Sequence, residues 1–277
     1  MKNWKTFLLL GRISNLPTVW SNVLAGAVLA GQVHTLSFAW LLLAASLFYV
    51  AGMFLNDAFD RNVDAIERPE RPIPSGQISA NAVFSIGFIM MLAGLALLVP
   101  LGWNAALAGL ALCACILLYD MHHKKNPFSP LAMGVCRALL YLLAAAGMGG
   151  NLPWLAAALI TAYVAGLTYT ARQENLLEFE NAWPLVIFAF PLLWVSVTAS
   201  AITIPFLLLF LGWTAYALRM VLLREVRNIR KAVGAMIAGI SLLDAVLIAE
   251  AEQPELAILA TFAFLLTLLL HRSIPGT

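Results

Sequence analysis

The sequence predicts an all-α integral membrane protein, a bundle of nine or ten transmembrane helices around a central cavity. Composition is the first observation behind this prediction, because 62% of the 277 residues are hydrophobic and only 11% are charged. Soluble domains have about 45–50% apolar and about 25% charged residues, so a soluble enzyme and a disordered chain are both excluded. The net charge of +2 is too small to indicate binding of nucleic acid.

The second observation is the length of the apolar runs. A helix needs about 20 apolar residues to cross the hydrocarbon core of a bilayer. Strands of a membrane barrel would alternate apolar and polar residues, and runs such as 204–212 do not alternate. We therefore expect one transmembrane domain over residues 1–277. The expected spans are 16–36, 38–56, 80–99, 102–119, 129–149, 152–170, 182–200, 202–222, 232–250 and 254–271.

The third observation is that basic residues occur in every second connection between these spans. Fifteen of the 16 lysine and arginine residues fall on one side of the expected membrane, and the exception is Arg137 inside a span. Basic loops remain in the cytoplasm of a bacterial cell. We therefore expect a multi-pass protein of the bacterial cytoplasmic membrane with both termini in the cytoplasm.

Acidic residues gather at the cytoplasmic end of the second expected span. Asp57, Asp60 and Asp64 are spaced three and four residues apart, so a helix that continues past the span puts them on one face, bordered by Asn56. Like charges on one face repel, and a divalent cation relieves the repulsion. Mg²⁺ usually binds one or two carboxylates plus substrate phosphates. The pattern favours a site for a magnesium-bridged diphosphate over a merely solvated helix end.

Basic residues and a second acidic pair extend this expected site. Arg68 and Arg71 lie in the proline-rich loop R-P-E-R-P-I-P-S-G and are candidates to contact diphosphate oxygens, or serve only to keep the loop in the cytoplasm. Arg172 is a further candidate substrate contact, and Glu174 and Glu178 follow it four residues apart. Four spans separate the two acidic clusters, so we expect them to meet in one cytoplasmic cavity that holds Mg²⁺.

The segment 56–64, read as N-D-x-x-D-x-x-x-D, and the following R-P-I-P-S-G at 71–76 resemble the first signature of the UbiA superfamily of intramembrane prenyltransferases. The span layout of essentially the whole chain is also similar to that family. The resemblance implies a helical bundle whose cavity opens sideways to lipid, with both acidic motifs at the cytoplasmic end. It further implies Mg²⁺-assisted transfer of an isoprenoid chain from a prenyl diphosphate to a small aromatic or otherwise lipophilic acceptor.

The resemblance also implies roles for single residues. Asp57, Asp60 and Asp64 would be catalytic and, together with Asn56, would hold the magnesium-bound diphosphate. Further residues implied to contact substrate are Asn22, Asn56, Arg71 and Lys124. The family's second motif is usually D-x-x-x-D, and here glutamates at 174 and 178 take its place, whose longer side chains shift the metal or the helix.

Arg137 and Asp244 are ionisable residues inside expected spans. Each costs about 2.5–3.5 kcal/mol at the bilayer centre, and such residues usually face a cavity and pair. Either the two pair with each other, or Arg137 binds substrate through an anionic group of the acceptor.

Two other functions remain open from the sequence. A carrier of an isoprenoid-type lipid would keep the diphosphate site without the chemistry, and the glutamate-containing second motif supports it. A phospholipid-type transferase is the second, although the D-G-x-x-A-R opening of such enzymes is absent from the sequence. The expected partners are a prenyl diphosphate, an unidentified small acceptor and the lipid bilayer, with no nucleic acid, and the expected cofactor is Mg²⁺.

Overall fold

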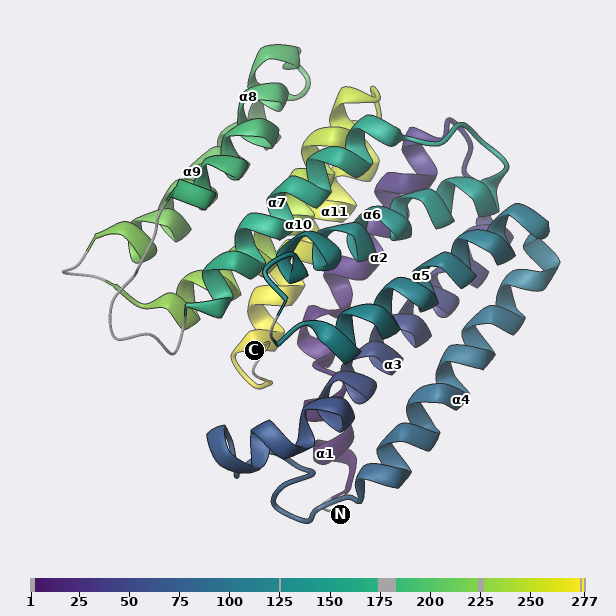
Figure 1. Ribbon diagram of the computed structural model, residues 1–277. Coiled ribbons are helices and arrows are strands. Elements are labelled where there is room, and N and C mark those ends of the chain that lie inside the picture. Colours follow the sequence, from purple (N-terminus) through teal and green to yellow (C-terminus); the bar gives the residue numbers. More distant parts are fainter. Residues whose placement is uncertain (1–2, 125, 174–182, 224–226, 275, 277) are drawn as a thin grey trace.

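The computed structural model describes residues 3–124, 126–173, 183–223, 227–274 and 276, and every regular element in these ranges is helical (Figure 1). The α-helices are α1 (Asn3–Leu10), α2 (Leu16–Leu29), α3 (Thr35–Glu67), α4 (Ala80–Leu98), α5 (Trp103–His122), α6 (Ser129–Met148), α7 (Trp154–Arg172), α8 (Ala189–Thr198), α9 (Ile204–Leu222), α10 (Ile229–Glu250) and α11 (Pro254–His271). The all-α prediction is therefore confirmed for this part of the chain.

Among the described residues, eight helices are long and apolar enough to cross a membrane, namely α3 to α7 and α9 to α11. Within these residues the number is lower than the nine or ten expected, because α2 has only 14 residues and α8 only 10. After α2, Gly31 adopts a left-handed conformation with φ of 81°, which ends the helix early. Before α8, Trp183–Phe188 form a 3₁₀ helix, and Pro191 lacks an N–H donor and fits only the first turn of an α-helix.

α3 is the helix that carries the acidic residues out of the apolar bundle. Its 33 residues span roughly 50 Å at 1.5 Å per residue, more than the ~30 Å hydrocarbon core. The expectation that this span continues as a helix through residues 57–64 is confirmed. In Figure 1, the end of α3, α1 and both chain ends lie in the lower half of the molecule as drawn.

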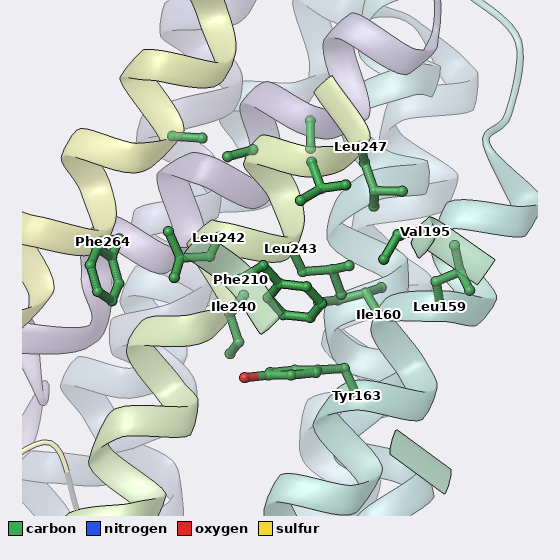
Figure 2. Packing of buried hydrophobic residues seen from close by; sticks show 14 of the residues in the cluster. Leu159, Ile160, Tyr163, Val195, Phe210, Ile240, Leu242, Leu243, Leu247 and Phe264 are labelled. Atoms are coloured by element: carbon green, nitrogen blue, oxygen red, sulfur yellow. The ribbon is translucent and has the colours of Figure 1, made fainter. Parts of the chain in front are cut away.

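α10 lies at the centre of the bundle, with 89% of its apolar segment buried, whereas the corresponding value is 28% for α5 and 22% for α11. Figure 2 shows Leu243 of α10 packed against Phe210 of α9 and Ile160 of α7. Tyr163 completes this core by donating a hydrogen bond to the Met236 carbonyl over 3.0 Å. The poorly buried helices present their leucine and phenylalanine side chains outward, as lipid-facing helices do.

α2 approaches α6 closely at Gly26. A Cβ atom at this position would lie 2.6 Å from the carbonyl oxygen of Tyr141, which is closer than two such atoms can come. Small residues at helix interfaces allow such contacts inside membranes. The contact brings the polar residues of α2 next to those of α6.

We predict that Gly26→Ala destabilises the protein by about 1–3 kcal/mol, because the added methyl group forces α2 away from α6. Gly212→Ala is the matched control, since nothing lies within 4 Å of a Cβ there. Alanine favours helix by up to ~1 kcal/mol over glycine, so the control should be neutral or slightly stabilising. Thermal unfolding in detergent micelles measures both variants, and equal melting temperatures would contradict the prediction.

Candidate functional site

A cavity of about 530 Å³ opens at the end of the bundle where α3 leaves it. We call this the acidic end. Residues of α3, α5, α6, α7 and α10 contribute to the walls. Charged residues of the lining are Arg12, Asp60, Asp64, Glu67, Arg68, Arg71, Asp120, Lys124, Arg137 and Arg172. The inner wall is mostly apolar and includes Phe48, Leu112, Ile116, Met133, Leu140 and Ile240.

The predicted acidic face of α3 is buried at this end. Asp57, Asp60 and Asp64 are only 6%, 6% and 1% exposed. Asp60 and Asp64 line the cavity, and Asp57 lies about one helical turn before Asp60. Buried carboxylates need charge partners or hydrogen-bond donors, and the structure supplies both from other segments.

Two arginines neutralise Asp57 and Asp64. Asp57 contacts Arg12 at 3.1 Å and Arg71 at 3.3 Å, and Arg71 also contacts Asp64 at 2.7 Å. Burial alone would lower the pKa of the Arg12 guanidinium, but negative charge led by that of Asp57 raises this pKa above its ordinary value. Arg12 has a φ of 41°, a left-handed conformation that costs a non-glycine residue about 1–3 kcal/mol. The Arg12 side chain contacts α3 from this left-handed backbone position.

The two residues that follow α5 supply the partners of Asp60. Its carboxylate lies 3.2 Å from Lys124 Nζ and 3.3 Å from His123 Nε2. Lys124, a predicted substrate contact, lines the same cavity as Asp60.

Asp120 is a member of the site that the sequence analysis missed. It is 4% exposed, lines the cavity, and accepts a hydrogen bond of 3.1 Å from Asn56 Nδ2 through Oδ1. Its Oδ2 atom is buried and has no hydrogen-bond partner among the described residues. The available signal was an acidic residue at the end of an expected span, four residues before Lys124 and on the same side of the membrane.

The remaining candidates at the acidic end are partly placed. Arg68 lines the cavity and makes no ion pair within the described residues. Arg172 also lines it, and donates to the Asn126 carbonyl at 3.1 Å and to Ser129 Oγ at 3.4 Å. Glu174 and Glu178 lie outside the described residues.

Asn22 and Arg137 meet deeper in the bundle. Asn22 is fully buried and accepts a 2.9 Å hydrogen bond from Arg137 through Oδ1. Its Nδ2 donates to both carboxylate oxygens of Asp244, at 3.1 and 2.9 Å. Asn22 thus bridges Arg137 and Asp244. From the sequence, a direct pair of these two residues was one of two possibilities. Arg137 lines the cavity, with its guanidinium 5.8 Å from the centre of the Tyr49 ring.

The donor set fits Mg²⁺ bound together with a diphosphate. In the described part of the chain, no three His, Cys, Asp or Glu side chains form a group that could hold a metal ion unaided. Asp57, Asp60 and Asp64 each contact basic side chains instead. Mg²⁺ needs only one or two carboxylates when substrate phosphates complete its coordination. Asp57, Asp60 and Asp64, with the unpartnered oxygen of Asp120, offer such ligands.

Fold and site together define a multi-pass helical membrane protein with an acidic cavity lined by basic residues. The model of the UbiA prenyltransferase family matches residues 16–176. The chain belongs to this family.

Relatives of known name match part of the chain. The digeranylgeranylglyceryl phosphate synthase of Methanoregula boonei is 39% identical over 121 residues, which are 42% of this chain and 42% of that protein. The chloroplastic chlorophyll synthase of Avena sativa is 38% identical over 101 residues, 34% of this chain and 26% of that protein. The matched region thus spans less than half of either relative.

Solved structures share the fold over more of the chain. A UbiA homolog from Aeropyrum pernix K1 superposes with a TM-score of 0.69 and 19% identity, covering 83% of this chain and 96% of that one. A UbiA homolog from Archaeoglobus fulgidus bound to GPP and Mg²⁺ gives a TM-score of 0.57 and 13% identity, covering 95% and 98%. At these identities the likeness shows the fold alone.

We predict that Arg71→Met destabilises the protein by about 3 kcal/mol, because removing one partner leaves a buried charge uncompensated. Arg71 is the only basic side chain paired with Asp64 in the described residues. Arg68→Met is the control, since Arg68 makes no such pair there. Adding Asp64→Asn to the Arg71 variant should restore part of the stability in a thermal unfolding series. Equal loss in both single variants would show that the ion pair contributes nothing.

Proposed function

We propose that the protein is a Mg²⁺-dependent prenyltransferase that moves an isoprenoid chain from a prenyl diphosphate to a small lipophilic acceptor inside the membrane. One observation carries this proposal. Three buried carboxylates share one face of α3, and two of them, with several basic side chains, line the mouth of a cavity whose inner wall is apolar. A prenyl diphosphate has the same division into a charged head and an apolar tail.

The acidic end provides the binding site for the diphosphate. Asp57, Asp60 and Asp64 would hold Mg²⁺, with Asn56 beside them and Glu174 and Glu178 as further candidate ligands. The basic side chains at the rim would contact diphosphate oxygens, and they are Arg68, Arg71, Lys124 and Arg172. Arg71 and Lys124 pair with carboxylates of α3 in the structure. Both side chains would contact the diphosphate instead when these carboxylates hold Mg²⁺.

The inner wall suits the isoprenoid chain. Phe48 precedes Asp60 by 12 positions on α3, about 18 Å along a helix. Leucine and isoleucine side chains of α5, α6 and α10 line this depth. Burial of apolar area supplies about 25 cal/mol per Å², so the tail contributes binding energy away from the reacting carbon.

In the proposed reaction, the bond between the prenyl carbon and the diphosphate oxygen breaks, and its electron pair leaves with the diphosphate. The acceptor atom forms the new bond to carbon and loses a proton. When bound, Mg²⁺ stabilises the charge that develops on the leaving diphosphate. The names of the synthase and chlorophyll synthase relatives support an acceptor that is lipophilic without having to be a simple aromatic ring. The distribution of basic residues supports a cytoplasmic location of the acidic end.

We predict that Asp57→Asn and Asp60→Asn each lower the rate of diphosphate release from geranylgeranyl diphosphate by about a hundredfold or more. The physical reason is the loss of a metal-binding charge, since a bound metal is worth several kcal/mol and each ~1.4 kcal/mol is tenfold in rate. Glu255→Gln is the control, because Glu255 is exposed in the first turn of α11. The measurement uses purified protein in nanodiscs, with folding of each variant checked by thermal unfolding.

Full activity in both folded aspartate variants would contradict the proposal. Binding of geranylgeranyl diphosphate by the wild-type protein without any diphosphate release, across acceptors of several classes, would favour the lipid-carrier function instead.

Removal of divalent metal provides a separate prediction. Treatment with EDTA should abolish diphosphate release and weaken binding of inorganic diphosphate, because the carboxylates repel an anion that brings no cation. Added Mg²⁺ should restore both. Isothermal titration with inorganic diphosphate, with and without Mg²⁺, measures the binding directly. Equal affinity in the two titrations would count against a metal-bridged site.

A further inference from the structure

Arg137 places a positive charge on the inner wall of the cavity, away from the acidic end. It lies eight residues beyond Ser129, the first residue of α6, which is about 12 Å along a helix. Ser129 itself contacts Arg172 at the acidic end. A diphosphate bound between α3 and the rim arginines therefore does not need Arg137.

The contacts of Arg137 leave its charge without a direct acidic partner. Its Nη1 donates to Asn22 Oδ1 at 2.9 Å, and none of the ion pairs among the described residues involves it. The nearby carboxylate of Asp244 is already occupied. It accepts hydrogen bonds from Asn22 at 3.1 and 2.9 Å, from Ser21 at 2.5 Å, and from the Tyr141 hydroxyl.

This arrangement fixes the guanidinium and leaves donors open to the cavity. The Asn22 amide donates its N–H groups to Asp244 and accepts from Arg137 through its oxygen, which fixes the orientation of the amide and of the guanidinium. The Tyr49 ring covers the guanidinium at 5.8 Å from its centre. Arginine has five N–H donors, and among the described residues only Nη1 of Arg137 has a hydrogen-bond acceptor, Asn22 Oδ1. Because Arg137 lines the cavity and none of its nitrogens is buried without a partner, the other donors face the open space.

Resting on the prenyltransferase function proposed above, we propose that Arg137 binds an anionic group of the acceptor, a carboxylate or a phosphate. A guanidinium matches either group through two parallel hydrogen bonds. A cation held among apolar helices without a direct counter-charge is costly, and an anionic acceptor supplies that charge. Asn22 and Asp244 are positioning residues for Arg137. The acceptor then lies with its anion inward and its reacting atom toward the acidic end.

The test compares charged probes with uncharged analogues of the same shape. The carboxylate pair is 4-hydroxybenzoate and 4-hydroxybenzyl alcohol, and the phosphate pair is geranylgeranylglyceryl phosphate and geranylgeranylglycerol. Affinities are measured from thermal stabilisation of the purified full-length protein in nanodiscs, without Mg²⁺ and without prenyl diphosphate. The wild-type protein is compared with Arg137→Gln and with Arg137→Lys, which keeps the charge.

We expect one anionic probe to bind the wild-type protein more tightly than its uncharged analogue. Arg137→Gln should weaken that probe by at least about tenfold, the value of a charge-assisted hydrogen bond. Arg137→Lys should recover part of the affinity, and the uncharged analogues should hardly respond to either substitution. The pair that shows the difference identifies carboxylate or phosphate as the group recognised.

The inference is overturned if neither anionic probe binds the wild-type protein better than its analogue, or if Arg137→Gln binds both probes as the wild type does. Should the glutamine variant not fold, the wild-type comparison of charged and uncharged probes decides. Binding of geranylgeranyl diphosphate with Mg²⁺ separates the two proposals. If that binding depends on Asp57 while no anionic acceptor depends on Arg137, the prenyltransferase function stands and only this inference fails.

Discussion

A carboxylate buried among apolar helices must find a cation or several hydrogen-bond donors, and this constraint governs the polar architecture of the protein. The requirement is met in two ways. On α3, Asp57, Asp60 and Asp64 are neutralised by basic side chains from three other segments. In the interior, Asp244 is surrounded by neutral donors from α2 and α6. The carboxylates of α3 can exchange their basic partners for a ligand. Asp244 instead holds the side chains of α2 and α6 in fixed positions.

The helical scaffold makes both arrangements possible. α3 is longer than the hydrocarbon core is thick, so its acidic turns lie at the mouth end of the cavity while its middle lines the apolar wall. The close contact of α2 with α6 at Gly26 puts Asn22 within hydrogen-bond distance of Arg137. The central helix α10 carries Asp244 to the same place. One cavity thus has a charged mouth, an apolar wall and a single deep cation.

Membership in the UbiA prenyltransferase family accounts for the shared parts of this design. The acidic face of α3 and the following arginine loop are the residues that carry the resemblance to that family in the sequence. Asp120 with its unpartnered oxygen and the Arg137 network lie outside those residues. Function resides in such sites rather than in the fold alone. Differences in acceptor between relatives of similar fold are therefore expected to lie along the inner wall.

Composition and local periodicity were sufficient for the membrane class, the helical fold and the common face of Asp57, Asp60 and Asp64, because these follow from the bilayer thickness and the 3.6-residue repeat. The motif of 56–64 was sufficient for the family. The short lengths of α2 and α8 were decided by local backbone conformation that apolar runs do not reveal. Only packing decided that Asn22 bridges Arg137, 115 residues away, and Asp244, 222 residues away. Side chains so distant in sequence meet through the summed contacts of many helices, and no local pattern encodes that sum.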